Sequence, residues 1–182
     1  MAIRILNPWL RFLRDVDRAL KEAVEVHCLG GFVLSVLWGL PRPTADVDVI
    51  EIRPHHAGEA LLRIGGQGSA LAEKHQIHFQ RVTVAEYPEG YEGRLIDMTP
   101  PGFRRLKLKA LEAHDVVLAK LSRNSARDRA DVEYLTRKGV LDRHRLEERF
   151  EVELRPYLLN EKRETLTLEL WLAEFFGKEE RD

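Results

Sequence analysis

The sequence predicts an α/β (α+β) fold, in which a small mixed sheet of four or five strands carries packed helices and is followed by a helical C-terminal region. Three observations indicate this fold. Two strand-like stretches, residues 24–29 and 46–52, flank a short apolar helix. Residues 104–111 alternate apolar and charged side chains, as a strand with one buried face does. After residue 140, apolar residues recur at helical spacing.

The other predicted elements follow in chain order. Residues 8–25 predict an amphipathic helix, because apolar side chains recur every three or four positions between charged ones. Residues 55–64 predict a second helix, in which the adjacent His55 and His56 cannot face one metal ion. Residues 76–84 and 94–98 predict two further strands.

The stretch from Arg104 to Leu111 is the clearest period-two segment in the chain. Its apolar and basic residues fall on opposite faces: Leu106, Leu108 and Ala110 on one, Arg105, Lys107 and Lys109 on the other. One interpretation is an edge or one-sided strand whose lysines prevent unwanted pairing. Another is a basic stripe that follows the phosphates of an RNA acceptor. Both can hold together.

Two helices are expected after this strand. Asp115 predicts the cap of the first, and Ser125 with Asp128 predicts a capping box that begins the second, which Gly139 ends. Lys120 lies among apolar residues and has two interpretations. It either extends its amine to water or presents a point charge to a triphosphate.

The chain is expected to form a first domain at residues 1–140 with a helical extension at 141–182 packed on it. Two amphipathic helices are predicted in the extension, from Asp142 to Tyr157 and from Glu161 to Phe176. Their expected packing positions are Leu146, Phe150, Leu154, Leu166, Leu170, Trp171, Phe175 and Phe176.

Composition limits the class of protein. The 182 residues include 29 basic and 30 acidic side chains, so any nucleic-acid-binding surface has to be a local patch. The single Cys28 excludes an internal disulfide and is typical of a reducing compartment. No apolar run is long enough to cross a membrane, and a cytoplasmic protein is expected. His75 and His78, three apart in an expected strand, predict no chelate.

A candidate site lies between residues 26 and 52. Gly30 and Gly31 end a strand just before an apolar helix, where free N–H groups and the helix dipole favour an anion. Asp46 and Asp48 alternate along the next strand and therefore face the same side. Two adjacent carboxylates repel each other, and a divalent cation relieves that repulsion. The order of these features predicts a site for a nucleoside triphosphate (NTP) with Mg²⁺.

These residues resemble a known signature. Gly30-Gly31, followed by Arg42-x-Thr44-x-Asp46-x-Asp48 and a hydrophobic strand, is similar to the motif of the DNA polymerase β nucleotidyltransferase superfamily, in particular the small nucleotidyltransferases related to AbiE-type toxins. A second stretch, DVVLAKLSRNSARDRADVEYL at residues 115–135, resembles the later motif of the family, a Lys-Leu pair followed by Arg-Asp-x-x-Asp. The likeness covers about residues 24 to 140.

The resemblance implies a role for each matching residue. Asp46 and Asp48 would hold one or two Mg²⁺ ions, and Gly30 and Gly31 would bind the NTP phosphates. Arg42 and Thr44 would reach the same phosphates or fix the aspartates; Lys120 would contact the triphosphate. Asp131, rather than Asp128, would complete the site as an acidic residue.

The chain departs from the superfamily pattern at two places, and three functions follow as alternatives. Phe32 replaces the usual Ser beside the glycines, and no third carboxylate stands on the 104–111 strand, so Asp97, Glu112 or Asp131 would have to serve. The first function is transfer of a nucleotide to the 3′ end of tRNA, as a toxin of a toxin–antitoxin pair would do. The second is modification of a protein hydroxyl on a cognate partner, as an antitoxin would do. The third is a degenerate module that binds nucleotide or partner without catalysis.

Overall fold

The computed structural model describes residues 3–177, which form two compact units. The first unit comprises residues 1–83 and 95–111, and the second comprises residues 84–94 and 112–182, apart from the ends that are not described. The boundary expected at residue 140 stays a prediction, since compactness alone does not define a segment that folds independently.

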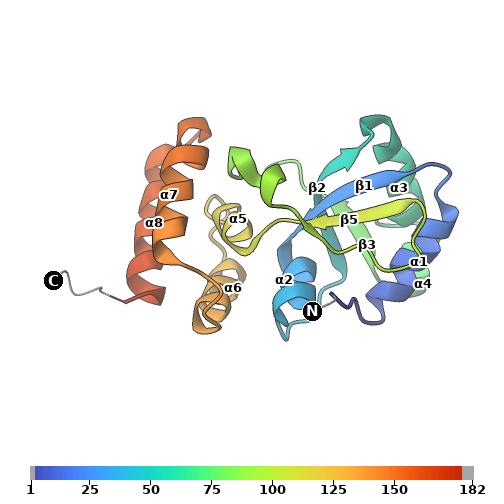
Figure 1. The fold of residues 1–182 in the computed structure, drawn as a ribbon, viewed down its shortest axis with the longest axis horizontal. Helices are drawn as coiled ribbons and strands as arrows, with labels where there is room; N and C mark the ends of the chain where they lie inside the picture. The colour runs from blue at the N-terminus through green and yellow to red at the C-terminus, as the bar shows by residue number, and fades with distance from the viewer. Residues whose placement is uncertain (1–2, 178–182) are drawn as a thin grey trace. The chain divides into compact units, whose positions relative to one another are not determined.

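The first unit is built on a mixed five-stranded sheet, as predicted, with the strand order β3-β2-β1-β5-β4 (Figure 1). Its strands are β1 (Val24–Leu29), β2 (Asp46–Arg53), β3 (His78–Arg81), β4 (Ile96–Asp97) and β5 (Leu106–Ala110). β1 pairs antiparallel with β2 and parallel with β5; β2 pairs parallel with β3. The observed β1 has the predicted bounds, whereas β3 and β4 are shorter than the stretches predicted for them.

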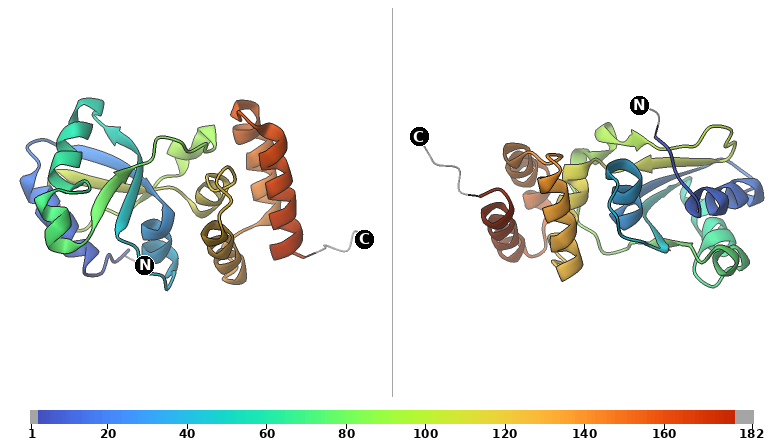
Figure 2. Two further views of the ribbon diagram at one scale, coloured as in Figure 1. Left: turned by 180° about the vertical axis from the view of Figure 1, so that it is seen from behind. Right: turned by 90° about the horizontal axis from the view of Figure 1, so that it is seen from below.

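One face of this sheet is apolar and lies under helices. Val26, Val47, Val49, Phe79 and Leu108 are at most 1% exposed on that face. It is covered by α1 (Trp9–Ala19), α3 (Gly58–Gly65) and α4 (Ala70–His75), as Figures 1 and 2 show. The predicted helix at 8–25 thus ends six residues early, and α4 was not predicted. The short 3₁₀ turn η1 (His55–Ala57) leads into α3.

β5 is not an edge strand, which corrects one of the two interpretations of its pattern. It pairs with β1 on one side and with β4 on the other. The one-sided pattern itself is confirmed, because Leu106, Leu108 and Ala110 are buried while Lys107 is exposed. Since β4 pairs with only two residues of β5, alternation in sequence could not distinguish this strand from an edge strand.

The second unit is helical. It contains η2 (Glu89–Arg94), α5 (Ala113–Leu118), α6 (Ala126–Arg137), α7 (Arg143–Arg149) and α8 (Glu161–Phe175). A π-helical turn, η3 (Phe150–Leu154), and a 3₁₀ turn, η4 (Arg155–Tyr157), continue α7. The predicted capping box of Ser125 and Asp128 begins α6, and Gly139 follows its end with φ +67°.

Two predictions about this unit were wrong. The side chain that caps α5 belongs to Glu112, which accepts the N–H of His114, and not to Asp115, which is fully buried. Leu166 and Leu170 are more than half exposed, whereas Leu168 and Leu172 are buried. The face of α8 that packs is therefore shifted from the predicted one.

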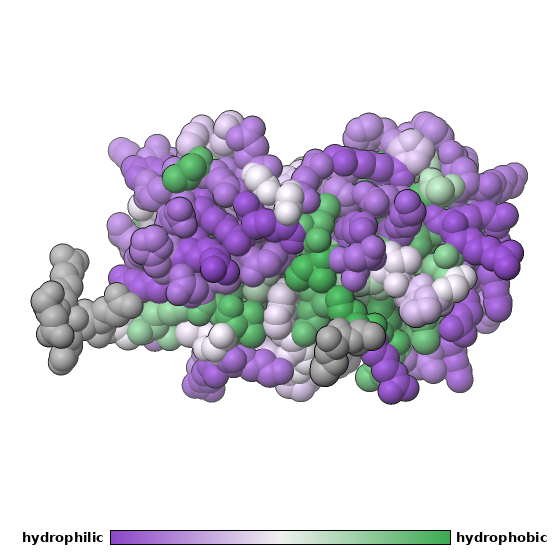
Figure 3. All heavy atoms as spheres, viewed as in Figure 1, coloured by the Kyte–Doolittle hydropathy of each residue, from purple (hydrophilic) through white to green (hydrophobic). Residues whose placement is uncertain are grey.

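The surface agrees with a charge-rich composition. Hydrophilic residues cover most of the face drawn in Figure 3. Among residues 3–177, no helix is long and apolar enough to cross a membrane.

Candidate active site

The site begins where β1 ends and α2 (Gly30–Trp38) starts. Leu29, the residue before the helix, is extended, and no side chain caps the free N–H groups of the first turn. Gly30 has φ +78°, a conformation that residues with a Cβ rarely adopt. The strand can therefore turn directly into the helix and present its N-terminal N–H groups to a ligand.

The missing side chains of the two glycines make room for the motif residues that follow. A Cβ on Gly30 would lie well under 3.0 Å from Oδ2 of Asp48. A Cβ on Gly31 would lie 3.4 Å from Nη2 of Arg42 and 3.5 Å from Cβ of Thr44. The two glycines thus bring the start of α2 against Asp48, Arg42 and Thr44, although the sequence separates these residues by up to 18 positions.

The turn between α2 and β2 is fixed by hydrogen bonds. The N–H of Asp46 donates to Oγ1 of Thr44 at 3.3 Å. Oγ of Ser35 donates to the carbonyl of Arg42 at 3.4 Å, and Nε1 of Trp9 donates to the carbonyl of Thr44 at 3.2 Å. Helices α1 and α2 therefore both hold the turn that carries Arg42 and Thr44.

Asp46 and Asp48 project from the face of the sheet opposite to the apolar core. The register pairs Asp46 with His78 and Asp48 with Leu29, which places Asp48 where β1 ends. The side chain of Asp46 is 38% exposed, and its Oδ1 lies 3.3 Å from Nε2 of His78. Burial, and then the charge of Asp48, raises the pKa of the Cys28 thiol far above its usual range, so Cys28 stays a protonated core residue.

His78 is a site residue that the sequence did not reveal. The expectation placed His75 and His78 in one strand, but His75 ends α4 and contacts Asp15, while His78 begins β3 and contacts Asp46. The signal lies in the parallel pairing of β2 and β3, which sets His78 directly beside Asp46. The sequence alone does not predict that these two strands pair.

Phe32 has a structural reason for replacing a hydroxyl residue. Its ring is fully buried and packs edge-on against Trp9, with 5.4 Å between the ring centroids. Because Trp9 also donates to the turn at Thr44, Phe32 supports the site from within the core and makes no contact of the kind a hydroxyl would.

Two of the candidates for a third carboxylate have other partners. Asp97 is on β4, where its Oδ2 accepts from Nζ of Lys109 at 2.8 Å. β4 is separated from β2 by both β5 and β1. Glu112 belongs to the second unit, in which it caps α5 and accepts hydrogen bonds from His114 and Arg149.

Lys120, Asp128 and Asp131 form a separate group in the second unit. Nζ of Lys120 lies 2.9 Å from a carboxylate oxygen of each aspartate. All three side chains are at most 6% exposed. Lys120 therefore does not extend to water. Burial opposes the charge of Asp128, but Arg123, Lys120 and Ser125 outweigh it and hold the pKa of Asp128 well below its usual range.

The residues of the first unit fit a hard divalent cation. Asp46 and Asp48 offer carboxylate oxygens on one face of a strand, and Gly30 leaves the space that Asp48 occupies. Within the described part of the chain, no group of three or more His, Cys, Asp or Glu side chains is arranged as a ready ligand set. Mg²⁺ is commonly held by only one or two protein carboxylates, so the pair is a sufficient protein contribution for that ion.

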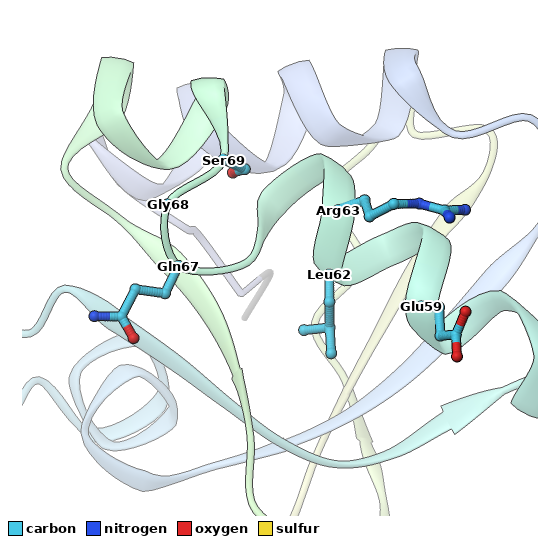
Figure 4. A pocket seen from close by; sticks show the side chains of 6 residues that line it. All are labelled: Glu59, Leu62, Arg63, Gln67, Gly68 and Ser69. Atoms are coloured by element: carbon cyan, nitrogen blue, oxygen red, sulfur yellow. The ribbon is translucent and has the colours of Figure 1, made fainter.

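A hollow elsewhere in the first unit contains none of these residues. It has a volume of about 500 Å³ and is lined by the α3 side chains of Glu59, Leu62 and Arg63 and by residues 67–69 (Figure 4). Of Gly65-Gly66-Gln67-Gly68, the first residue ends α3 and the others begin the connection to α4; no Lys-Ser/Thr pair follows as a P-loop requires.

A comparison with protein families identifies one match. The model of a family described as "Nucleotidyltransferase of unknown function (DUF6036)" matches residues 11–179. No curated protein and no solved structure matches the chain.

Proposed function

The chain belongs to this family of nucleotidyltransferases, and we propose that it transfers a nucleoside monophosphate from an NTP, with Mg²⁺, to a hydroxyl group of an acceptor. The favoured acceptor is the 3′ end of tRNA. Pyrophosphate would be the other product.

The approach of Gly30 to Asp48 is the observation that carries the proposal. It joins an uncapped helix N-terminus, which favours phosphate, to a pair of carboxylates, which favour a divalent cation. Neither feature alone is specific, because glycine turns and acidic strand ends are common. Their contact at the point where β1 ends is what an NTP carrying Mg²⁺ requires.

Each residue has a proposed role. Asp46 and Asp48 would hold Mg²⁺, which when bound neutralises charge on the phosphates and the attacking oxygen. The first-turn N–H groups at Gly30 and Gly31 would orient the terminal phosphates, and Arg42 would add a planar donor beside them. Thr44 holds the backbone of Asp46, and His78 fixes its carboxylate from the neighbouring strand.

The proposed contact between Lys120 and the triphosphate requires Lys120 to give up an existing partner. Lys120 already binds two buried carboxylates, so phosphate oxygens would have to replace at least one of them. Asp131, proposed as an acidic residue of the site, would then be released from that lysine. The resemblance of residues 115–135 to the later family motif supports these two roles.

The proposals for the acceptor and for the cellular role are supported by fewer observations than the proposal for the NTP site. Basic side chains of β5 favour an RNA acceptor over a protein hydroxyl. A role as a toxin–antitoxin component, with a cognate protein as partner, rests on the sequence resemblance alone and stays a prediction.

Label transfer tests the proposal. The protein would be incubated with each α-labelled NTP and Mg²⁺, together with total tRNA or with the protein encoded by the adjacent gene. We expect label on tRNA from wild type and none from Asp46→Ala. Label only on the protein encoded by the adjacent gene would show that the acceptor is a protein hydroxyl and not tRNA. Absence of label on every acceptor, with NTP binding intact, would reject catalysis and leave a nucleotide-binding module.

A further inference from the structure

A second hollow in the first unit is lined by arginines and lies away from the aspartates. It has a volume of about 470 Å³ and is formed by the exposed side of α1 and the turn that leads into β5. Its lining includes Arg14, Asp17, Arg18, Phe103, Arg104 and Arg105. Figure 1 shows α1 beside the start of β5.

The backbone of this hollow is rigidly held by Asp17. Oδ1 of Asp17 accepts the N–H groups of Arg104, Arg105 and Leu106 at 3.0, 2.7 and 2.8 Å. Asp17 is itself only 7% exposed. Asp17 thus fixes the backbone of Arg104 and Arg105, and its single negative charge is set against four guanidinium groups in the lining of the hollow.

The arginines themselves are poorly neutralised. Within the described residues, Arg14 and Arg104 have no carboxylate partner, and Arg105 donates to the carbonyl of Arg18 at 3.4 Å. Arg18 lies 3.8 Å from Asp15, a carboxylate that is bound more closely by Lys74 at 2.8 Å. Four exposed guanidinium groups therefore surround one hollow in a chain whose net charge is −1.

The chemistry of the hollow fits the phosphates of a nucleic acid. Arginine binds phosphate oxygens through two parallel N–H bonds, and several arginines together match a polyanion. Phe103, half-buried in the lining, adds an aromatic surface of the kind on which bases stack.

The position of the hollow favours a long acceptor. It lies where β1 begins, since the N–H of Val24 donates to the carbonyl of Arg105, whereas Asp48 lies where β1 ends. Six residues of strand separate the two ends by about 16 Å. The aspartates also project from the face of the sheet that α1 does not cover. A small anion in the hollow could therefore not reach them, whereas a polymer with a phosphate at every nucleotide could reach both places by passing around the sheet.

We propose that the arginine hollow formed by Arg14, Arg18, Arg104 and Arg105 binds the phosphodiester backbone of the RNA acceptor. This inference rests on the proposed function for the identity of the acceptor. It assigns RNA binding to residues outside the site that holds the NTP.

Binding of labelled tRNA to the full chain, measured by fluorescence anisotropy without NTP, tests this assignment. The variant is Arg14→Ala with Arg18→Ala. Its matched control is Arg11→Ala with Arg63→Ala, which removes the same charge from exposed positions of the same unit outside the hollow. A further variant, Arg14→Lys with Arg18→Lys, keeps the charge. Thermal unfolding checks that all variants are folded.

We expect the alanine variant of the hollow to bind tRNA at least about 10-fold more weakly than wild type. The slope of log K against log[salt] should become shallower by about 1.4, which is about 0.7 for each phosphate contact to a single strand. The control should bind as wild type does, and the lysine variant should keep most of the salt slope. Equal weakening in the hollow variant and the control, or no binding of tRNA by wild type, would overturn the assignment.

This assay separates the two proposals. If wild type transfers label to tRNA and the hollow variant binds tRNA normally, the proposed function stands and the hollow has no part in it. If wild type transfers no label and only the hollow variant loses tRNA binding, the hollow binds RNA and the proposed function fails.

Discussion

Gly30 lacks the side chain that would collide with Asp48. Asp48 occupies the space that a Cβ on Gly30 would fill, and φ at Gly30 lies in the left-handed region. Both conditions apply to one residue. Replacement by alanine therefore acts on the backbone and on the carboxylate together.

Gly30→Ala should lower the rate of nucleotide transfer by about 100-fold, because displacement of a catalytic group by about 1 Å has that effect. Gly68→Ala is the matched control: Gly68 has φ +79°, but nothing lies within 4 Å of an added Cβ. Both variants should lose about 1–2 kcal/mol of stability from backbone strain. Equal transfer rates in the two variants would show that Asp48 does not need the space at Gly30.

Lys120 should be important for stability whether or not it contacts nucleotide. Lys120→Met removes a buried amine from Asp131 and from Asp128, which keeps Arg123, and should lower the free energy of unfolding by about 3–5 kcal/mol. Urea denaturation measures this loss. An unfolding free energy within about 1 kcal/mol of wild type would mean that the two carboxylates are satisfied without Lys120.

At the scale of elements, α8 provides a direct test of which face packs. Leu168 is 4% exposed and Leu166 is 55% exposed. Leu168→Ala should destabilise the protein by about 2–5 kcal/mol, as truncation in a core does, whereas Leu166→Ala should change stability by less than about 0.5 kcal/mol. Similar losses measured by urea denaturation for both variants would indicate that the two faces are equally buried.

The same helix shows what the sequence could and could not predict about elements. Leucines occupy positions 166, 168, 170 and 172 of α8, so more than one helical stripe is apolar. The existence of the helix followed from its pattern, but the buried stripe depends on the neighbouring helix, α6. The interior position of β5 was undetermined for a similar reason, because strand order is a property of pairing and not of one segment.

At the scale of the whole molecule, networks of charge make stability depend on pH. Burial opposes the charge of Glu112, but hydrogen bonds from His114 and Arg149 lower its pKa from 4.5 to about 2. A lowered pKa means that the unfolded chain binds the proton more tightly. The stabilisation is therefore present above pH 4.5 and is lost as pH falls toward 2.

The free energy of unfolding should consequently fall as the pH is lowered from about 5 to about 2, with Glu112 contributing on the order of 3 kcal/mol. Glu112→Gln should flatten this part of the profile. The pKa of Glu164 is raised, mainly by burial, so the contribution of Glu164 to the free energy of unfolding increases as the pH falls. Denaturation at several pH values measures the profile, and an identical slope in wild type and Glu112→Gln would contradict the assignment.

The candidate site was predicted in part. Gly30, Gly31, Asp46 and Asp48 lie close in sequence, and local strand and turn rules sufficed to group them, whereas Arg42 and Thr44 were added by the resemblance to a family motif. His78 and the arginine hollow bring together residues that are 32 to 91 positions apart, which only the folded chain reveals. The bond of Lys120 to Asp128 and Asp131 was missed because helical spacing alone does not show which polar side chains are buried.

The most direct test of the central claim is the transfer rate of Asp48→Asn relative to wild type, with Mg²⁺ and the preferred labelled NTP. This substitution keeps the shape of the side chain beside Gly30 and removes its charge, and thermal unfolding would verify that the fold is retained. We predict a rate at least about 1,000-fold lower, because electrostatic stabilisation supplies most of the catalysis in phosphoryl transfer. A rate within about threefold of wild type, in a variant that is equally well folded, would contradict the assignment of this site.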